Sequence, residues 1–506
     1  MHANDCGLSR RGFIASAFAA YATSGCRSLG ICGEKPNIVF GVISDIHITT
    51  PESTATFRRA LAYFRDCGVD AVVVSGDLSD WGLRSGLEYV ADAWYSVFPG
   101  DRAPDGRKVE KLFCTGNHDY DGYWYGDMTL DMHVQGYSEE EALVKLGMKK
   151  CWEEAFHEPF EQVRRRTVKG YDFISSEWKE GKDGFKDAEA WFAANGGTLD
   201  PKKPFFVFTH YPFKGTTSCS GGSAYSGDVF KRFPNAVTFS GHCHWTLNDE
   251  RSIWQGGYTA IAVPSMSYTS VPRGYENGFD KRNGKSKRSM QILPSRRNLN
   301  EAQGYVVSVF DGRMEIERRD FTEGVEAAPA WIVPLPAAAG SRYAPANSRK
   351  LTPVPQFPAN AAVRTHTSNF ETRNYSWTIM MMLEFPSAHA RGGRVFDYEV
   401  RAEMEDGSVA AVKRFLSPAF YKLERDEPNI QSLAFDAMDL PERGRYRLRV
   451  YPRNCFGDCG RPISSAVLES KPGKDKAQRW EKTLSGSVFE RRQFQKPQIA
   501  DASNMV

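Results

Sequence analysis

Gly116-Asn117-His118-Asp119 follows the short apolar run 112–114. On its own the tetrapeptide indicates little, because Asn and Gly favour turns and a single His is usually structural. Similar polar groups occur elsewhere, as Asp45-Ile46-His47, Gly76-Asp77-Leu78-Ser79-Asp80, Thr209-His210-Tyr211 and Gly241-His242-Cys243-His244. Each of them also follows an apolar run of strand length. The tetrapeptide is therefore one member of a repeated arrangement.

The apolar runs before these groups predict buried strands, at 38–43, 71–74, 112–114, 205–208 and 237–239. Continuous Val, Ile and Phe bounded by turn residues is typical of strands that are covered on both faces. Helical spacing between them, as in Phe57, Ala60, Leu61 and Phe64, indicates an α/β architecture. The polar side chains would then meet at the carboxyl ends of the strands, where open α/β sheets bind ligands.

The side chains gathered there are carboxylates, imidazoles and one amide, and their chemistry suits divalent transition metals. The candidate ligands exceed the needs of one ion: Asp45, His47, Asp77, Asn117, His210, His242 and His244. They would fill two adjacent sites if one carboxylate bridged both ions. Two-metal sites of this kind clamp a phosphoryl group and activate water.

The groups and their order resemble the calcineurin-like metallophosphoesterase family over roughly residues 37–321. The resemblance implies two mixed sheets packed as a sandwich with helices outside. It also implies two divalent metal ions, with Mn, Fe and Zn all compatible with the ligands. Asp45 and His47 would hold the first ion, His244 would return to it, and Asp77 would bridge both.

By the same resemblance, Asn117, His210 and His242 would hold the second ion. His118 matches the family's outer-sphere histidine, which contacts the phosphate or protonates the leaving oxygen. Asp80 matches the carboxylate that orients this histidine. The implied reaction is hydrolysis of a phosphomonoester or phosphodiester by a metal-bound hydroxide. The alternative is a cell-surface binding protein whose phosphoesterase domain is vestigial.

The composition is that of a soluble globular protein, with 506 residues of which 41% are hydrophobic and 25% charged. The length predicts two or three domains. A net charge of only +3 argues against a surface dedicated to a polyanion, so no obligate nucleic-acid partner is expected. The expected partner is the phosphate ester substrate.

Residues 1–30 are expected to be a targeting segment. Ser9-Arg10-Arg11-Gly12-Phe13-Ile14 resembles a twin-arginine export signal, and the apolar run 15–22 is too short to span a membrane. Thr23-Ser24-Gly25-Cys26 allows a second interpretation, a lipoprotein attached to the membrane through Cys26. A third is a cytoplasmic N-terminal helix. We expect export across the bacterial inner membrane, to the periplasm or the cell surface.

The remaining chain is expected to divide by composition. The catalytic domain would cover 35–325, with an insert at 120–170 whose aromatic residues form a lid or pack onto the domain. The Arg- and Lys-rich stretch 273–297 reads as a solvated loop, or as one that attracts phosphate at the mouth of the site.

A Pro- and Ala-rich connector is predicted at 326–360, followed by an all-β domain at 361–470 and a polar tail at 471–506. Tyr446 and its neighbours resemble the tyrosine corner of fibronectin type III domains, which would bind glycan or protein. The connector predicts that this domain folds independently. Cys455 and Cys459 are close enough in sequence for a local disulfide.

Overall fold

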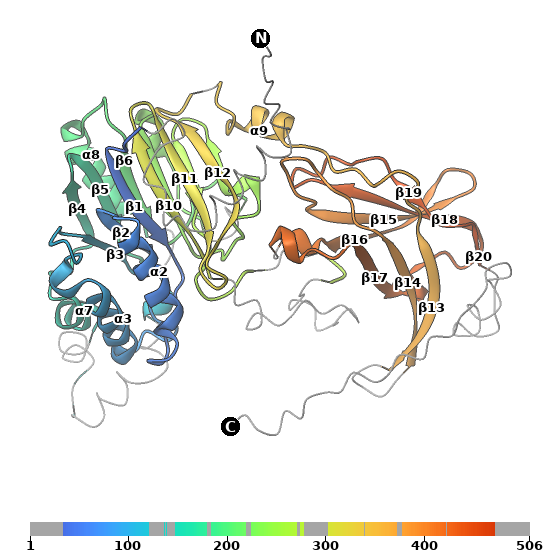
Figure 1. Cartoon of the computed structure of the whole chain (residues 1–506), viewed down its shortest axis with the longest axis horizontal. Coiled ribbons are helices and arrows are strands. Elements are labelled where there is room, and N and C mark those ends of the chain that lie inside the picture. Colours follow the sequence, from blue (N-terminus) through green and yellow to red (C-terminus); the bar gives the residue numbers. More distant parts are fainter. Residues whose placement is uncertain are drawn as a thin grey trace, which may run out of the picture.

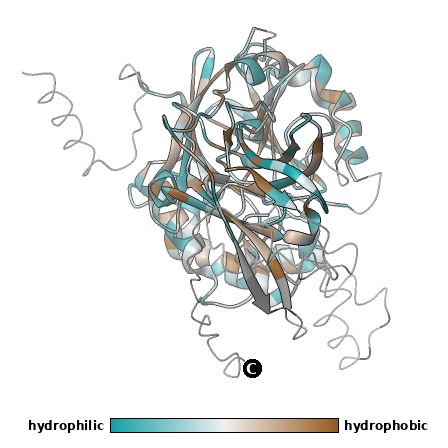
Figure 2. Cartoon of the chain, turned by 90° about the vertical axis from the view of Figure 1, so that its right-hand side faces the viewer, coloured by the Kyte–Doolittle hydropathy of each residue, from teal (hydrophilic) through white to brown (hydrophobic). Residues whose placement is uncertain are grey.

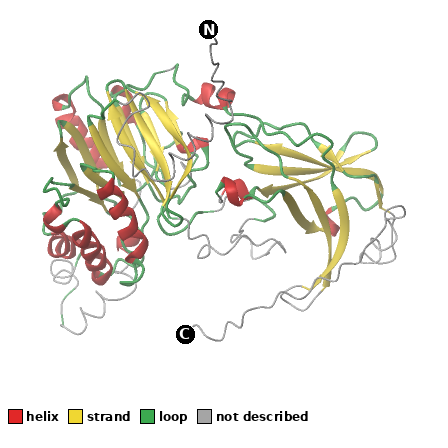
Figure 3. Cartoon of the chain, in the orientation of Figure 1, coloured by secondary structure: helices red, strands yellow, loops and turns green. Residues whose placement is uncertain are grey.

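The computed structural model describes residues 34–120, 136, 138, 147–179, 184–218, 224–270, 274–277, 302–338, 340–371, 377–420 and 423–470. The chain forms an N-terminal domain of strands and helices and a C-terminal domain made mainly of strands (Figure 1, Figure 3). The targeting segment, the aromatic residues 123–125, the basic stretch 278–297 and the tail lie outside the described residues.

The first sheet of the N-terminal domain has the strand order β12-β11-β10-β1-β2-β3. Its strands are β1 Ile38–Ile43, β2 Ala71–Ser75, β3 Glu110–Cys114, β10 Gln303–Phe310, β11 Arg313–Asp320 and β12 Val325–Pro334. β1, β2 and β3 run parallel, whereas β10 to β12 are antiparallel to their neighbours. The carboxyl ends of the three parallel strands therefore lie at one edge.

The second sheet has the order β4-β5-β6-β7-β9-β8. Its strands are β4 Val163–Val168, β5 Tyr171–Ser176, β6 Phe205–Thr209, β7 Ala236–Ser240, β8 Ile253–Gln255 and β9 Thr259–Ala262. The central strands β5, β6, β7 and β9 are parallel. The five predicted strands are thus all present, but they are divided between two sheets.

A core between the two sheets joins them face to face. Phe40 of β1 contacts Phe173, Phe206 and Phe239 of the second sheet, with ring centroids 5.1, 4.9 and 6.0 Å away. These side chains belong to one buried cluster that also includes Trp331 of β12. The arrangement confirms the two-sheet sandwich implied by the sequence resemblance.

Helices cover the outer faces of the sandwich (Figure 3). α2 Thr54–Asp66, α3 Arg84–Val97 and α7 Met148–Phe156 pack on the first sheet, and α8 Lys186–Asn195 packs on the second. α2 lies so close to β1 that a Cβ on Gly41 would meet the Phe64 ring at 2.6 Å. Gly41 therefore permits the contact between helix and sheet.

Two antiparallel sheets make up the C-terminal domain. One has the order β13-β14-β17 and the other β16-β15-β18-β19, with β20 also paired to β18. The bounds are β13 Arg364–Glu371, β14 Trp377–Pro386, β15 Asp397–Met404, β16 Val409–Leu416, β17 Ile430–Asp436, β18 Gly444–Arg453, β19 Ile463–Ser464 and β20 Leu468–Ser470. Burial alternates along β18, and Figure 2 shows hydrophilic and hydrophobic residues interleaved in this domain. The all-β prediction is confirmed, whereas the fibronectin type III resemblance stays a prediction.

The structure differs from the predicted connector at 326–360. Residues 325–334 form β12, the edge strand of the first sheet, and α9 Pro345–Leu351 follows. Trp331 and Val333 of β12 are buried while Ile332 between them is 36% exposed. This alternation is typical of a strand with one buried face, and Pro329 is tolerated inside it because β12 is an edge strand.

The second half of the predicted insert at 120–170 contains a helix and a strand, α7 and β4. Trp152 and Phe156 of α7 are fully buried in the core beneath the first sheet, and β4 pairs with β5. The helical and strand segments at 148–168 are therefore integral to the domain.

The cysteines do not form the expected local bridge. Cys455 and Cys459 are both free thiols, Cys455 buried and Cys459 exposed. Cys67 is disulfide-bonded. No helix in the described ranges is both long and apolar enough to cross a membrane.

Candidate metal centre

The predicted ligands lie on loops that leave the carboxyl ends of β1, β2, β3, β6 and β7. Several of them have left-handed backbone conformations, with φ of 53° at Asp45, 47° at His47, 51° at Asp77, 70° at His242 and 49° at His244. Non-glycine residues adopt this conformation only where the surrounding structure enforces it, and such residues concentrate at functional sites. The loops are thus shaped to direct these side chains inward.

Asp45, His47, Asp77 and His244 form one buried group whose ligand atoms all lie within 4.8 Å of one another. His244 Nε2 is 3.1 Å from Asp45 Oδ1. His47 Nε2 is 3.5 Å from Asp77 Oδ2 and 3.2 Å from His244 Nε2. Two sheets contribute to this group, because His244 follows β7 whereas the others follow β1 and β2.

The hydrogen bonds of the two histidines test whether this group fits a cation. His47 Nδ1 lies 2.8 Å from Asp80 Oδ1, and His244 Nδ1 lies 3.1 Å from the Tyr268 carbonyl oxygen. Since both oxygens accept, the Nδ1 atoms donate, and the neutral rings present lone pairs at Nε2. These lone pairs face each other and two carboxylates. A proton relieves one such contact, whereas a divalent ion satisfies all of them, so the residues fit a metal.

A second group surrounds the other side of Asp77. His210 Nε2 is 3.2 Å from Asp77 Oδ2 and 3.0 Å from Asn117 Oδ1. His210 Nδ1 donates to the Ser75 carbonyl oxygen at 3.0 Å, so Nε2 is the ring nitrogen that faces the oxygen atoms. The His242 ring lies beside them, with its centroid 5.1 Å from that of His210. Asp77 Oδ2 is therefore shared by the two groups.

The electrostatics reflect this concentration of charge. Burial raises the pKa of Asp77, but His210 and His47 outweigh it and hold the pKa well below its usual range. Burial would lower the pKa of His210, yet Asp77 and Asp45 raise it to about 9. Burial and then His210 lower the pKa of His242 to about 4. Near pH 7 Asp77 is therefore ionised and His242 is neutral, whereas His210 carries a proton that a bound cation would displace.

His118 lies at the edge of the site, with its side chain 32% exposed and its ring centroid 4.7 Å from that of His47. Its Nδ1 donates to the backbone oxygen of Asp80 at 2.8 Å and is 3.6 Å from the Asp80 carboxylate. The carboxylate is closer to His47 Nδ1, at 2.8 Å. Asp80 thus orients His118 chiefly through its backbone and His47 through its side chain.

Three further residues support the site without having been predicted. Asp119 accepts hydrogen bonds from the backbone N–H groups of Gly116, Leu78 and Ser79 at 2.8, 3.1 and 2.7 Å, and so ties two ligand loops together. Tyr268 accepts from His244 and packs against its ring at 4.0 Å.

Glu177 is the third supporting residue. It is buried and accepts from the Thr115 backbone N–H and hydroxyl at 2.6 and 2.8 Å, just before the Asn117 loop. Glu177 directly follows β5, so the pattern that identified the ligands, a polar residue just after an apolar strand, could have predicted it. The contacts of Asp119 and Tyr268 depend on long-range packing that no local pattern reveals.

The comparisons with known proteins agree with this geometry. The sequence profile of the calcineurin-like phosphoesterase family matches residues 38–245. A comparison with curated protein sequences finds no significant match. The N-terminal domain is a calcineurin-like phosphoesterase domain, the domain of metal-dependent phosphoric ester hydrolases.

A comparison with solved structures finds matches at low sequence identity. One is the Plasmodium protein GAP50, the anchor in the inner membrane complex, at 13% identity, covering 62% of this chain and 93% of that one with a TM-score of 0.35. Another is a predicted phosphoesterase from Streptococcus pneumoniae, at 13% identity, 59% and 97% coverage and a TM-score of 0.24. A third is an archaeal phosphodiesterase, at 10% identity, 56% and 100% coverage and a TM-score of 0.24.

Proposed function

We propose that the chain hydrolyses a phosphomonoester or phosphodiester with two divalent metal ions centred on Asp77. The observation that carries this proposal is the position of Asp77 Oδ2, which lies 3.5 Å from His47 Nε2 and 3.2 Å from His210 Nε2. One carboxylate is thereby placed between two separate sets of ligand atoms. A dinuclear site needs such a bridging group, because it offsets the repulsion between two adjacent dications.

The candidate ligands form two sets, one for each ion. Asp45, His47 and His244 would hold one ion, Asn117, His210 and His242 the other, with Asp77 shared. When bound, two divalent ions lower the pKa of a coordinated water and neutralise charge on the phosphoryl group. Mn, Fe and Zn all suit this mixture of nitrogen and oxygen ligands.

The protein groups beside the ligands would handle orientation and protons. The hydrogen bond from His47 Nδ1 to the Asp80 carboxylate fixes the tautomer that presents Nε2. The hydrogen bond from His118 Nδ1 to the Asp80 backbone oxygen fixes the His118 ring at the edge of the site. From there His118 is suited to protonate the leaving oxygen of the ester.

A binding protein with a vestigial phosphoesterase domain is the competing function. The ligand set argues against it, since every position implied by the family resemblance is occupied by a ligand-competent residue. The left-handed backbone of Asp45, His47, Asp77, His242 and His244 argues in the same direction, because a decayed site has no need to keep it.

The test combines metal analysis of the purified protein with turnover of paired chromogenic monoester and diester substrates. We expect close to two metal ions per chain and hydrolysis of at least one substrate class. Asp77→Asn removes the shared charge, so metal content and activity should fall together. A wild-type protein that bound no divalent metal and hydrolysed neither substrate would favour the vestigial alternative.

We also propose that the protein is exported by the twin-arginine route. The Arg10-Arg11 pair motivates this, and the disulfide at Cys67 supports it because disulfides persist in oxidising compartments. Replacing both arginines by Lys should leave the protein in the cytoplasm when cells are fractionated. Normal export of that variant would contradict the proposal. Mass analysis of the exported chain would distinguish cleavage from lipid attachment at Cys26.

A further inference from the structure

The loop that carries His242 and His244 continues directly into the contact between the two domains. Trp245 packs in a small apolar cluster with Phe396, Leu416 and Cys455 of the C-terminal domain. Three positions further on, the Asn248 amide donates to the Ala419 carbonyl oxygen at 3.3 Å. The loop after β7 is therefore held between the two domains immediately beyond its ligands.

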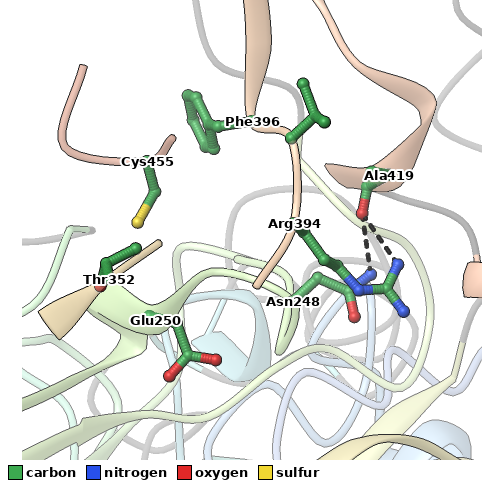
Figure 4. Close-up of a pocket in the computed structure, with 8 residues that line it drawn as sticks. Asn248, Glu250, Thr352, Arg394, Phe396, Ala419 and Cys455 are labelled. Atoms are coloured by element: carbon green, nitrogen blue, oxygen red, sulfur yellow. Dashed lines mark hydrogen bonds between the residues drawn. The ribbon is translucent and has the colours of Figure 1, made fainter. Parts of the chain in front are cut away.

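A pocket lies at this contact between the two domains (Figure 4). Asn248 and Glu250 line it from the N-terminal domain, and Arg394, Phe396 and Cys455 line it from the C-terminal domain. Nearby, the Arg251 guanidinium lies 4.7 Å from the Phe396 ring centroid and is paired with Asp249 at 2.7 Å. A partly buried, paired arginine at such a boundary indicates a specific contact rather than a loose one.

A second segment of the N-terminal domain, residues 274–277, also contacts the C-terminal domain. Tyr275 donates its hydroxyl to Asp397 at 2.9 Å. The Asn277 amide donates to the Leu416 carbonyl oxygen at 2.9 Å and accepts from the Leu416 N–H at 2.8 Å. Glu276 N also donates to the Arg414 carbonyl oxygen at 2.8 Å. Residues 274–277 are thus attached to the end of β16 by both backbone and side chains.

The same segment begins at the metal centre. The Ser265 hydroxyl donates to the Asp45 carbonyl oxygen at 3.1 Å, and the Tyr268 carbonyl oxygen accepts from His244 Nδ1 at 3.1 Å. Ser270 N donates to the His244 carbonyl oxygen at 2.8 Å. Only residues 271–273 separate Ser270 from Gly274. One short stretch of chain therefore touches two candidate ligands at one end and the C-terminal domain at the other.

We propose that the C-terminal domain positions His244 through this stretch, with Tyr275 and Asn277 as positioning residues. The inference rests on the proposed metal site. Attachment of 274–277 to β16 restrains 265–270, and that restraint holds the Tyr268 carbonyl oxygen against His244 Nδ1. The hydrogen bond selects the tautomer with its lone pair on Nε2, so its loss weakens the ligand. By linkage, metal binding in turn favours the docked arrangement of the two domains.

Asn277→Ala tests the proposal, with Tyr275→Phe as a milder variant that keeps the ring. Asn235→Ala is the matched control, because Asn235 is also buried and its amide donates to backbone oxygens of another segment, Asp200 and Lys203. Asn235 precedes β7, whereas His242 follows it. Both alanine variants lose a buried amide, but only Asn277 contacts the C-terminal domain.

Two readouts are needed, and one of them uses the metal-free protein. Backbone hydrogen exchange of the Met266 and Ser270 amides, which bond to Ser44 and His244 oxygens, should accelerate in Asn277→Ala and less in Tyr275→Phe. Titration with Zn²⁺ against a chromogenic chelator should show affinity reduced by about tenfold in Asn277→Ala, the low end for outer partners of a metal ligand. Asn235→Ala should leave both unchanged.

The outcomes separate this inference from the proposed function. Unchanged exchange at 266–270 in Asn277→Ala, or equal changes in Asn235→Ala, would overturn the positioning role. Accelerated exchange with unaltered Zn²⁺ affinity would also overturn it, since restraint of the loop would then not matter to His244. A wild-type chain that bound no Zn²⁺ would instead count against the metal site itself, whatever the exchange result.

Discussion

His118 and Asp77 lie in adjacent loops and are joined by a hydrogen bond, yet their positions indicate different roles. The His118 backbone N–H donates to Asp77 Oδ1 at 3.0 Å, while the His118 ring turns to the Asp80 backbone oxygen. Asp77 is buried among ligand atoms, whereas the His118 side chain is about one third exposed. The first residue is built into the candidate metal centre and the second lies at its partly exposed edge.

The variant His118→Ala should therefore keep its metals and lose rate. We expect close to wild-type metal content and a fall in kcat of about 10²–10⁴, the usual effect of removing a general acid or base. The defect should shrink for esters of good leaving groups, which need little protonation. Metal analysis and a leaving-group series measure both effects.

His157→Ala is the matched control, because the His157 ring stacks on Tyr95 at 5.8 Å and belongs to neither ligand group. It should retain both metal and rate. Loss of metal from His118→Ala, or an equal deficit for good and poor leaving groups, would show that His118 is a ligand or a structural residue.

Glu177 predicts a pH dependence of stability. Burial raises the pKa of Glu177 to about 7 from its ordinary 4.5, although Arg164 and Thr115 act in the opposite direction. Because folding favours the protonated form, the stabilisation is present below pH 4.5 and is lost as the pH rises through about 7. Glu177→Gln should remove this loss and exceed wild-type stability above pH 7 by up to about 3 kcal/mol.

Denaturant unfolding of the metal-free proteins at several pH values measures this difference. Glu158→Gln serves as the control, since Glu158 pairs at 2.7 Å with Arg164, the residue whose charge lowers the pKa of Glu177. A Glu177→Gln variant whose stability kept the wild-type pH dependence would contradict the assigned cause.

At the scale of single elements, β12 shows that a proline-containing strand can complete a sheet. Arg318 of β11 lies 4.5 Å from the Trp331 ring centroid, and Trp331 Nε1 donates to Glu250 at 3.0 Å. Glu250 belongs to the segment that follows His244. β12 therefore connects the edge of the first sheet to the region beside the metal centre.

The neighbouring residues Trp331 and Ile332 provide a test of this strand. Trp331→Ala should destabilise the protein by about 3–5 kcal/mol, the usual cost of removing a buried large aromatic side chain. Ile332→Ala on the opposite face should change stability by about 0.5 kcal/mol or less. Denaturant unfolding distinguishes the two. Similar small effects from both variants would contradict the burial of Trp331 and would favour the predicted connector for residues 325–334.

At the scale of the whole molecule, buried residues of the C-terminal domain contact the N-terminal domain. Leu423 of the C-terminal domain belongs to the core cluster between the two N-terminal sheets. Arg394 donates to the Ala327 carbonyl oxygen of β12 at 3.2 Å. These contacts indicate that the two domains stabilise each other, whereas independent folding of the C-terminal domain stays a prediction.

A chain that ends at Arg349 should consequently be less stable than the full chain. It loses the contacts of Leu423, Phe396 and Asp397 and exposes the apolar surface around Trp245. We expect a melting temperature lower by roughly 5–10 °C, which corresponds to a few kcal/mol for a protein of this size. An unchanged melting temperature and unchanged metal affinity would show that the domains are independent.

A pair of leucines separates the interface from general effects of truncation. Leu423→Ala should cost about 2–5 kcal/mol, as large-to-small substitutions in cores do. Leu351→Ala, at a residue that is 53% exposed, should be nearly neutral. Thermal unfolding of both full-length variants provides the comparison.

The ligand types and their order could be read from the amino-acid sequence alone. Each ligand directly follows an apolar run, and such runs become strands through local pattern and burial, as with β1 before Asp45 and β7 before His242. The all-β character of the C-terminal domain could also be predicted, because the alternation of apolar and polar residues along a strand is a local pattern.

Contacts between distant segments could not be predicted in this way. The division of the ligand strands between two sheets, the closeness of the Asp80 carboxylate to His47 and the docking of Asn277 on β16 all join residues far apart in sequence. Such pairings depend on which surfaces the folded chain brings together, and packing in the assembled molecule outweighs local composition. For this protein, the sequence indicates which groups are candidate metal ligands, and the folded structure shows what holds those groups in place.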